Sequence, residues 1–447
     1  MMKTFSLKSQ TALPNFPLKP VTKRIINKIN AEDRRFHDWY RFVLSFPPHL
    51  VRTYLNDFEI GDKHTVLDPF CGTGTTIAEC KLQGIRSVGV EALPFSHFVS
   101  SVKVDWSIEA DRLRQYAEHI ADNTLNELGK QEIDDDTDFE GDIHKLSLRT
   151  LDSNSKKLLI KDSISPIPLH KTLILLEKIN KISEKLYYNH IVLALAKALV
   201  FSIGNLHFGP EVGVRKIKYD TPVISAWLSE VKKISNDLEM IKGQKYPDSD
   251  VLLGDSRCIS QFIPSDSIDA VITSPPYPNE KDYTRTTRLE SVLLGFIKDN
   301  SELRKSKKSL VRSNTRGVYK GDNDYKWIND NDDINQLADT IEQRRIELCK
   351  NSGFEKLYST VTRLYFGGMA KHLFEISKIL RPGAKLAYIV GDQASYFRVM
   401  IKTGDILAKI AQSIGYELLR IDLFRTRQST STKSGLREEV IVLRWNG

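Results

Sequence analysis

The feature that most constrains the fold is a short apolar segment that runs directly into a glycine-rich turn. Residues 65–70 (TVLDPF) are typical of a short buried strand, and residues 72–76 (GTGTT) predict a tight turn. A helix is expected over 77–83, closed by Gly84, and a second strand is expected over 87–92. This order of strand, turn, helix and strand predicts the start of a doubly wound α/β sheet with parallel strands.

Later segments predict the rest of the sheet. A buried strand is expected over 268–273, and an amphipathic helix over 365–380, with Pro382 and Gly383 as its end. Three further strands are expected over 385–390, 417–423 and 439–443. The last two would pair as an antiparallel hairpin around the polar stretch 425–435, so the sheet is expected to be mostly parallel with an antiparallel end.

Two long segments interrupt this frame and divide the 447 residues into five parts. The core is expected to comprise residues 1–104, 251–282 and 360–447. Residues 105–250 predict a largely helical insertion, in which the acidic tract 132–142 is interpreted as a solvated loop. Residues 283–359 form a second insertion that is first basic and then acidic, and its stretch 301–320 has seven basic residues against one acidic residue.

Composition excludes several classes of protein. Lys and Arg number 65 against 57 Asp and Glu, an excess that allows an anionic partner without requiring one. The longest apolar stretch, 191–204, is interrupted by Lys197 and falls short of the ~18 residues of a membrane span. The N-terminus does not resemble a signal peptide. The four cysteines form no CxxC pair, so reduced thiols in a cytoplasmic protein are expected, without a metal site.

The glycine-rich turn predicts a ligand site. Gly72 and Gly74 remove side chains where a ligand approaches the backbone, and the helix that follows aims free N–H groups at a carboxylate or phosphate. The turn is not a P-loop, because no Lys follows the glycines. It does not match the dinucleotide fingerprint either, because Ile77 occupies the position of the third glycine. A GxG pattern by itself is also typical of an ordinary tight turn.

Two acidic residues beside the turn narrow the choice of ligand. Asp68 ends the first strand, where it can meet an ammonium group. Glu91 ends the second strand, where an acid can accept hydrogen bonds from the hydroxyls of a ribose. A ligand with an amine, a carboxylate and a ribose fits S-adenosylmethionine better than NAD.

A second motif, Thr-Ser-Pro-Pro-Tyr at 273–277, follows the strand expected over 268–273. The two prolines remove two N–H donors and restrict the backbone, which leaves carbonyl groups free to accept hydrogen bonds. Ser274 adds a side-chain oxygen and Tyr277 adds an aromatic face. Together these groups can hold an amino group on a planar ring, although such a motif alone is also typical of a rigid turn at a strand end.

The two motifs together, DPFCGTGTT at 68–76 and TSPPY at 273–277, resemble those of the DNA amino-methyltransferases, the exocyclic-amine family of restriction–modification enzymes. The resemblance implies a Rossmann-like class I methyltransferase fold, S-adenosylmethionine as cofactor and double-stranded DNA as substrate. Ser274 is similar to the residue found in the N4-cytosine branch, whereas the N6-adenine branch more usually carries Asp or Asn there. A restriction endonuclease acting on the same site is a candidate partner.

The resemblance also implies roles for individual residues. The catalytic residues would be Ser274, Pro275, Pro276 and Tyr277. The cofactor-binding residues would be Phe46, Pro47, Asp68, Phe70, Gly72, Gly74, Thr75, Thr76, Glu91, Asp255 and Ser256. Asp255 resembles the residue that contacts the cofactor adenine. The candidate contacts to DNA, taken from basic positions of the sequence, are Arg285, Arg288, Lys307, Lys308, Arg312, Arg316, Arg425 and Arg427.

The mechanism implied is a direct transfer to a flipped-out base. Tyr277 would stack on the ring, while Ser274 and the Pro275 carbonyl would accept hydrogen bonds from the amine, which attacks the methyl group in line. Cys71 is not expected to be a nucleophile, because it lies in the cofactor loop and the Pro-Cys pair of C5-cytosine methylation is absent.

Three alternatives stay open from the sequence: an adenine-N6 methyltransferase, an RNA guanine-N2 methyltransferase and a catalytically idle DNA-binding subunit. The part of the chain that reads the DNA sequence is also open. The first insertion, 105–250, has the size for this role, and the second, 283–359, has the charge.

Overall fold

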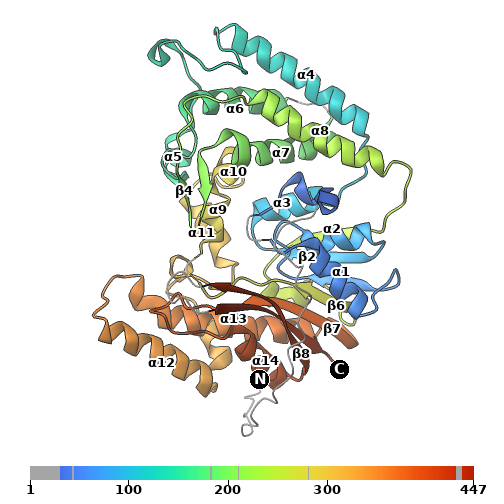
Figure 1. Ribbon diagram of the computed structural model, residues 1–447, viewed down its shortest axis with the longest axis vertical. Coiled ribbons are helices and arrows are strands. Elements are labelled where there is room, and N and C mark those ends of the chain that lie inside the picture. Colours follow the sequence, from blue (N-terminus) through green and yellow to red (C-terminus); the bar gives the residue numbers. More distant parts are fainter. Residues whose placement is uncertain (1–30, 43–44, 182–183, 210, 280, 429–434) are drawn as a thin grey trace.

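The computed structural model describes residues 31–42, 45–181, 184–209, 211–279, 281–428 and 435–447, and a seven-stranded sheet lies at its centre (Figure 1). The strand order is β5-β2-β1-β6-β7-β9-β8. The strands are β1 (Thr65–Asp68), β2 (Arg86–Glu91), β5 (Ser249–Leu253), β6 (Ile268–Thr273), β7 (Leu380–Gly391), β8 (Glu417–Gln428) and β9 (Gly435–Arg444). β5, β2, β1, β6 and β7 pair in parallel, and β9 pairs antiparallel with β7 and β8. The prediction of a Rossmann-like α/β fold ending in an antiparallel hairpin is therefore confirmed.

Helices cover both faces of the sheet because successive side chains of each strand point to opposite sides. Val66 of β1 belongs to a core cluster with Leu50 of α1, whereas the next residue, Leu67, belongs to a second cluster with Phe366 of α13. The helices of the core are α1 (Pro48–Asp57), α2 (Thr75–Leu82), α3 (Pro94–Lys103), α13 (Tyr358–Ser377) and α14 (Thr403–Ile414). α1 and α3 begin with proline, whose fixed φ suits the first helical position.

The predicted end of the helix over 365–380 is wrong. α13 spans Tyr358–Ser377, and Pro382 and Gly383 lie inside β7. The pairing register between β6 and β7 shifts at this point. Such a bulge accommodates a proline without an N–H, and Gly383 adopts φ +88° there.

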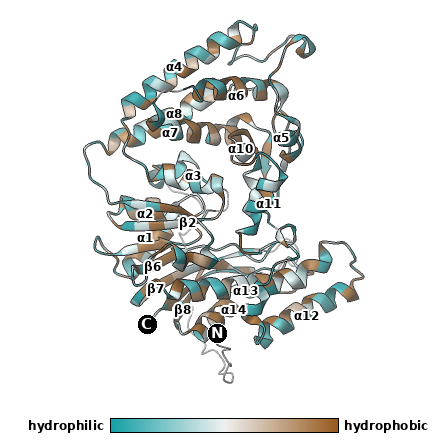
Figure 2. Ribbon diagram, turned by 180° about the vertical axis from the view of Figure 1, so that it is seen from behind, coloured by the Kyte–Doolittle hydropathy of each residue, from teal (hydrophilic) through white to brown (hydrophobic). Residues whose placement is uncertain are grey.

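The first insertion is helical, as expected, and forms the upper part of Figure 1. Its helices are α4 (Ala110–Gly129), α5 (Ser153–Leu158), α6 (Pro166–Ile179), α7 (Lys185–Ala198) and α8 (Ile224–Met240), with a small antiparallel pair, β3 (Leu206–Phe208) and β4 (Val212–Val214). α7 is largely hydrophobic (Figure 2). The helical stretch Lys185–Ile203 is long and apolar enough to cross a membrane, but 72% of it is buried inside the protein, as in a core helix.

The interpretation of the acidic tract 132–142 as a solvated loop is wrong for Asp135. Its side chain is only 3% exposed and accepts hydrogen bonds from the backbone N–H groups of residues 223–225, where α8 begins. A carboxylate at this position satisfies helix N–H groups that have no partner within the helix.

The second insertion does not pack as one unit. Its helices are α9 (Tyr283–Thr286), α10 (Arg288–Leu293), α11 (Asn300–Lys308) and α12 (Asp332–Glu347). Leu289 and Leu293 of α10 join the core of the helical insertion, whereas Ile334 and Ile341 of α12 join the cluster around α13. Along the chain, α11 lies between these two attachments, and Val311 after it already joins the cluster around α13.

Candidate active site

One open cavity joins the two sequence motifs. Its walls include Phe70, Gly72 and Glu91 from the ends of β1 and β2, and residues 274–277 from the end of β6. β1 and β6 are neighbours in the sheet, and the strands that follow each of them in the chain are added on opposite sides. Ligands of such sheets bind at this topological switch point. The cavity is open to solvent, and its empty volume of about 1580 Å³ includes part of that solvent.

The glycine-rich turn is held from beneath by a buried lysine. Gly72 and Gly74 adopt φ +55° and +79°, a region that favours glycine. The Lys103 ammonium donates a hydrogen bond of 2.6 Å to the Thr73 carbonyl, and the residue is only 1% exposed. Burial lowers the pKa of Lys103 to about 7. The sequence analysis did not single out Lys103, because only the packing of α3 brings it under the turn.

Glu91 ties the two strand ends together and lines the cavity. Its two carboxylate oxygens accept hydrogen bonds of 2.8 Å from the N–H groups of Gly72 and Leu93. Burial raises the pKa of Glu91 to about 7. Since each oxygen has two lone pairs, the carboxylate can still accept hydroxyl groups of a ligand.

Asp68 lies fully buried behind the cavity wall. Its Oδ1 accepts hydrogen bonds from the Thr273 hydroxyl (2.6 Å) and the Phe70 N–H (3.2 Å). Oδ2 has no partner among the described residues. Burial raises the pKa of Asp68 to about 6. A buried carboxylate oxygen without a donor is complementary to a cation such as an ammonium group.

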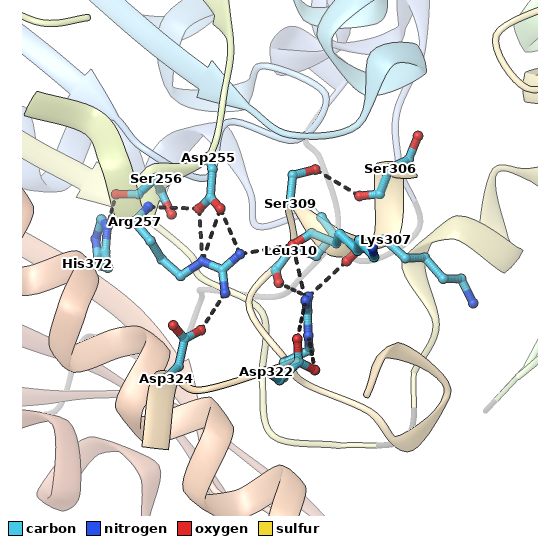
Figure 3. Close-up of polar contacts among 12 residues, drawn as sticks. Asp255, Ser256, Arg257, Ser306, Lys307, Ser309, Leu310, Asp322, Asp324 and His372 are labelled. Atoms are coloured by element: carbon cyan, nitrogen blue, oxygen red, sulfur yellow. Dashed lines mark hydrogen bonds and ion pairs between the residues drawn. The ribbon is translucent and has the colours of Figure 1, made fainter. Parts of the chain in front are cut away.

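His372 contacts the cavity wall beyond β5 through Ser256 (Figure 3). Ser256 lines the cavity, and its carbonyl lies 3.1 Å from Nδ1 of His372. Nε2 of His372 lies 2.7 Å from the Tyr388 hydroxyl, and burial lowers the pKa of His372 to about 4. The imidazole is therefore neutral at pH 7. A carbonyl can only accept, so Nδ1 carries the hydrogen and Nε2 accepts from Tyr388.

The Ser-Pro-Pro-Tyr motif presents acceptors to the cavity. The Ser274 hydroxyl donates its hydrogen to the Ile389 carbonyl at 3.1 Å, so its oxygen remains an acceptor. Tyr277 packs over Gly391 at the end of β7: a Cβ on Gly391 would lie 3.0 Å from the Tyr277 ring and 3.4 Å from Nη2 of Arg427. Glu438 forms ion pairs with both Arg425 and Arg427, the latter at 2.7 Å.

Comparisons with known proteins agree with this geometry. A family described as DNA methylase, covering N6 and N4 methyltransferases, matches residues 21–97. The type II methyltransferase M.BsoBI of Geobacillus stearothermophilus is 26% identical over 446 residues, covering 92% of this chain and 84% of that protein. M.AvaI of Nostoc sp. is 24% identical over 438 residues, covering 92% of this chain and 86% of that protein.

These matches support a DNA amino-methyltransferase of restriction–modification type. The crystal structure of TrmN from Thermus thermophilus is also similar, with a TM-score of 0.30 at 12% identity. That alignment covers 92% of this methyltransferase and about half (53%) of the TrmN chain. The family implies S-adenosylmethionine as cofactor, and the Glu91 carboxylate at the cavity wall fits its ribose hydroxyls. Oδ2 of Asp68, which has no hydrogen-bond partner among the described residues, has the charge to match its ammonium group but lies behind the wall.

The cavity of the methyltransferase contains only part of the predicted cofactor set. The residues at the wall are Phe46, Phe70, Gly72, Thr75, Glu91 and Ser256. The residues outside the wall are Pro47, Asp68, Gly74, Thr76 and Asp255. The Thr76 hydroxyl donates to the Ile272 carbonyl, and the Asp255 carboxylate binds the Arg257 side chain, so both act behind the wall. All four residues of the predicted catalytic set line the cavity.

The predicted DNA contacts fall into four groups. Arg425 and Arg427 line the cavity, and Lys308 and Arg316 are exposed. Arg285 is half-buried on α9. The other three are engaged within the protein: Arg288 donates to the Thr284 carbonyl, Lys307 pairs with Asp282, and Arg312 pairs with Asp322 at 4% exposure.

Several cavity residues were missed from the sequence. Asn279, Lys281 and Tyr283 line the cavity just after the Ser-Pro-Pro-Tyr motif, and their closeness in sequence could have indicated them. Leu310 and Val311 also line it, but no local signal identifies them. Only the path of the second insertion brings them to the cavity.

Proposed function

We propose that this methyltransferase transfers the methyl group of S-adenosylmethionine to the N4 amine of a cytosine in double-stranded DNA. The observation that carries the proposal is the Ser274 hydrogen bond to the Ile389 carbonyl. It leaves the Ser274 oxygen as an acceptor beside Tyr277, in the same cavity as the glycine-rich turn. The serine in this position also resembles the N4-cytosine branch of the family.

The residues that would hold the cofactor lie on the β1–β2 side of the cavity. Glu91 would accept the ribose hydroxyls at the wall. Asp68, directly behind the wall, would supply negative charge toward the ammonium group through Oδ2. When bound, S-adenosylmethionine supplies an electrophilic methyl group on a sulfonium. Cys71 lies in the same loop, but burial raises the pKa of its thiol well above the ordinary range, which fits a residue without a covalent role.

The reaction needs orientation more than acid–base chemistry. The target nucleotide would be flipped into the cavity at a cost of a few kcal/mol, and its ring would stack on Tyr277. The Ser274 oxygen and the Pro275 carbonyl would accept the two N–H bonds of the amine. These bonds aim the nitrogen lone pair at the methyl group for an in-line displacement.

Exposed basic side chains near the cavity would contact DNA phosphates. On α11 and in the segment after it, the exposed ones are Arg304, Lys305, Lys308, Arg316 and Lys320. Arg425 and Arg427 stand at the cavity itself. Phosphate contacts position the duplex and make affinity depend on salt, without reading sequence.

The experiment that tests the function is mass spectrometry of nucleosides after incubation of plasmid DNA with the protein and S-adenosylmethionine. We expect N4-methylcytosine, and mapping the modified positions then gives the recognition site. Detection of N6-methyladenine instead would show that the target base is adenine and would overturn the cytosine assignment. A methylated guanine in RNA, or cofactor binding without any modified nucleoside, would overturn it in favour of an RNA enzyme or an idle subunit.

Cofactor affinity is expected to fall as the pH is lowered from 7.5 to 5. The pKa of Glu91 is raised to about 7 and that of Asp68 to about 6, so both carboxylates gain protons in this interval. Both carboxylates interact with the cofactor in their charged forms, so protonation of either carboxylate competes with cofactor binding. Affinity should fall by up to about tenfold per pH unit for each group below its pKa.

Calorimetry in buffers of different ionisation enthalpy measures this effect, and binding at pH 6 should release protons. The matched variant is Glu91→Gln, in which the step near pH 7 should disappear while the step near pH 6 remains. Affinity that stays constant between pH 5 and 7.5 would contradict these roles.

A further inference from the structure

The cofactor side of the cavity has a wall that comes from the second insertion. Ser309, Leu310 and Val311 line the same cavity as Gly254 and Ser256, which follow β5. Val311 is 5% exposed, and Leu310 is half-buried. The two wall segments thus face one cavity although more than fifty residues separate them in the chain.

Arg257 connects these two segments (Figure 3). It follows Ser256 directly and is only 7% exposed. Its guanidinium donates to both oxygens of Asp255 (2.7–3.2 Å) and to Oδ2 of Asp324 (2.5 Å). It also donates to the Lys308 carbonyl at 3.1 Å, immediately before the wall segment. Burial acts to lower the pKa of Arg257, but the hydrogen bonds and charges of Asp255 and Asp324 outweigh it and raise the pKa above its ordinary value, so Arg257 remains charged.

Arg312 holds the other end of the segment and is 4% exposed. It forms a two-point ion pair with Asp322, with both contacts at 2.8 Å. It donates as well to the carbonyls of Lys307 (2.9 Å), Lys308 (3.1 Å) and Leu310 (2.5 Å). The Lys308 carbonyl is therefore bound by both arginines. These are carbonyls at the C-terminal end of α11, where cations are favourable.

We propose that residues 309–311 form the outer wall for the adenine of S-adenosylmethionine, and that Arg257 and Arg312 are positioning residues that hold this wall. The proposal rests on the proposed function and extends it to the second insertion. Leu310 and Val311 are apolar, as the flat face of a purine requires of its neighbours, and they line the same cavity as Gly254 and Ser256. The arginines fix the distance between the two walls, because Arg257 bonds to both.

The same arrangement links DNA binding to cofactor binding. Lys308 is exposed, so its side chain can contact a phosphate while its carbonyl is held by both arginines. A duplex that fixes the end of α11 therefore fixes the wall segment. DNA should strengthen cofactor binding, and by linkage the cofactor should strengthen DNA binding by the same factor.

The first test measures binding of S-adenosylhomocysteine, the unreactive product, by calorimetry without DNA. Leu310→Ala removes the apolar wall, and Arg257→Lys keeps the charge but cannot reach Asp255, Asp324 and the Lys308 carbonyl together. We expect about fivefold or greater weakening in both variants. The control is Arg363→Lys, which alters the ion pair with Asp339 between α13 and α12. Affinity within twofold of wild type in Leu310→Ala would overturn the wall assignment, even if Arg257→Lys failed to fold.

The second test repeats the titration with a saturating duplex that carries the mapped methylation site. In the wild type we expect DNA to tighten S-adenosylhomocysteine binding by about 5-fold to 20-fold. In Arg257→Lys the ratio should approach one, a change that lower stability alone would not produce. An unchanged ratio would overturn the positioning role. If the wild type methylates no DNA, the proposed function fails, and the titration without DNA still decides the wall assignment.

Discussion

Replacing Tyr277 by alanine is expected to lower kcat/KM for DNA methylation by about 100-fold or more. Base stacking on an aromatic ring contributes ~1–3 kcal/mol, and loss of orientation at the reacting amine adds to this. Tyr277 lines the cavity beside Ser274 and packs over Gly391, so its ring is held in one place. The measurement is single-turnover methylation of the mapped duplex with saturating cofactor.

The matched control is Tyr277→Phe, which keeps the ring and removes only the hydroxyl. It should retain most of the activity, because the proposed role is stacking. Affinity for S-adenosylhomocysteine should stay within about twofold in both variants. A Tyr277→Phe enzyme as slow as Tyr277→Ala would show that the hydroxyl group, not the ring face, carries the effect.

Replacing Gly367 by alanine is expected to destabilise the protein by about 3 kcal/mol, as in an overpacked core. A Cβ at this position of α13 would lie 2.1 Å from the Asp324 carbonyl oxygen, so the backbone of the 3₁₀ turn Asp324–Ile328 must move. Alanine normally stabilises a helix by ~1 kcal/mol relative to glycine. A loss of stability in Gly367→Ala would therefore identify the close approach of the Asp324 carbonyl as its cause. Thermal unfolding measures it, with an expected fall in Tm of about 5 °C or more.

Gly368→Ala is the neighbouring control. Its Cβ would meet Val311 and the Asp324 side chain at 3.3 Å, which a small side-chain shift can relieve. We expect a Tm loss less than half that of Gly367→Ala. Equal losses in the two variants would indicate that glycine is needed for the path of the helix and not for the approach of Asp324.

The local elements of the core were predictable because each carries its own signal. β6 has the predicted bounds, Ile268–Thr273, and β2 and β8 begin within one residue of the prediction. The error at Pro382 and Gly383 has a specific cause. This pair usually ends a helix, but here it is placed in a bulge by the pairing of β7 with β6. A strand bulge depends on the neighbouring strand, which a local pattern does not include.

Basic residues were the least predictable part of the site, because a charge count does not show what each charge faces. Arg312 belongs to the most basic stretch of the sequence, yet it is buried and bound to Asp322 and three carbonyl groups. Lys103, by contrast, belongs to no motif and lies buried beneath the glycine-rich turn, where it binds the Thr73 carbonyl. Tertiary packing places the groups that bind these two side chains.

The sequence by itself determined the family resemblance, the strand ends that carry the two motifs and the chemistry of their residues. These follow from adjacent residues, whose spacing along a strand or turn fixes where they point. The tertiary structure alone decided that Oδ2 of Asp68 has no hydrogen-bond partner among the described residues, that Ser274 donates to the Ile389 carbonyl, and that residues 309–311 line the cavity. Each of these depends on contacts between segments distant in the chain, which only the folded arrangement of the sheet and its insertions brings together.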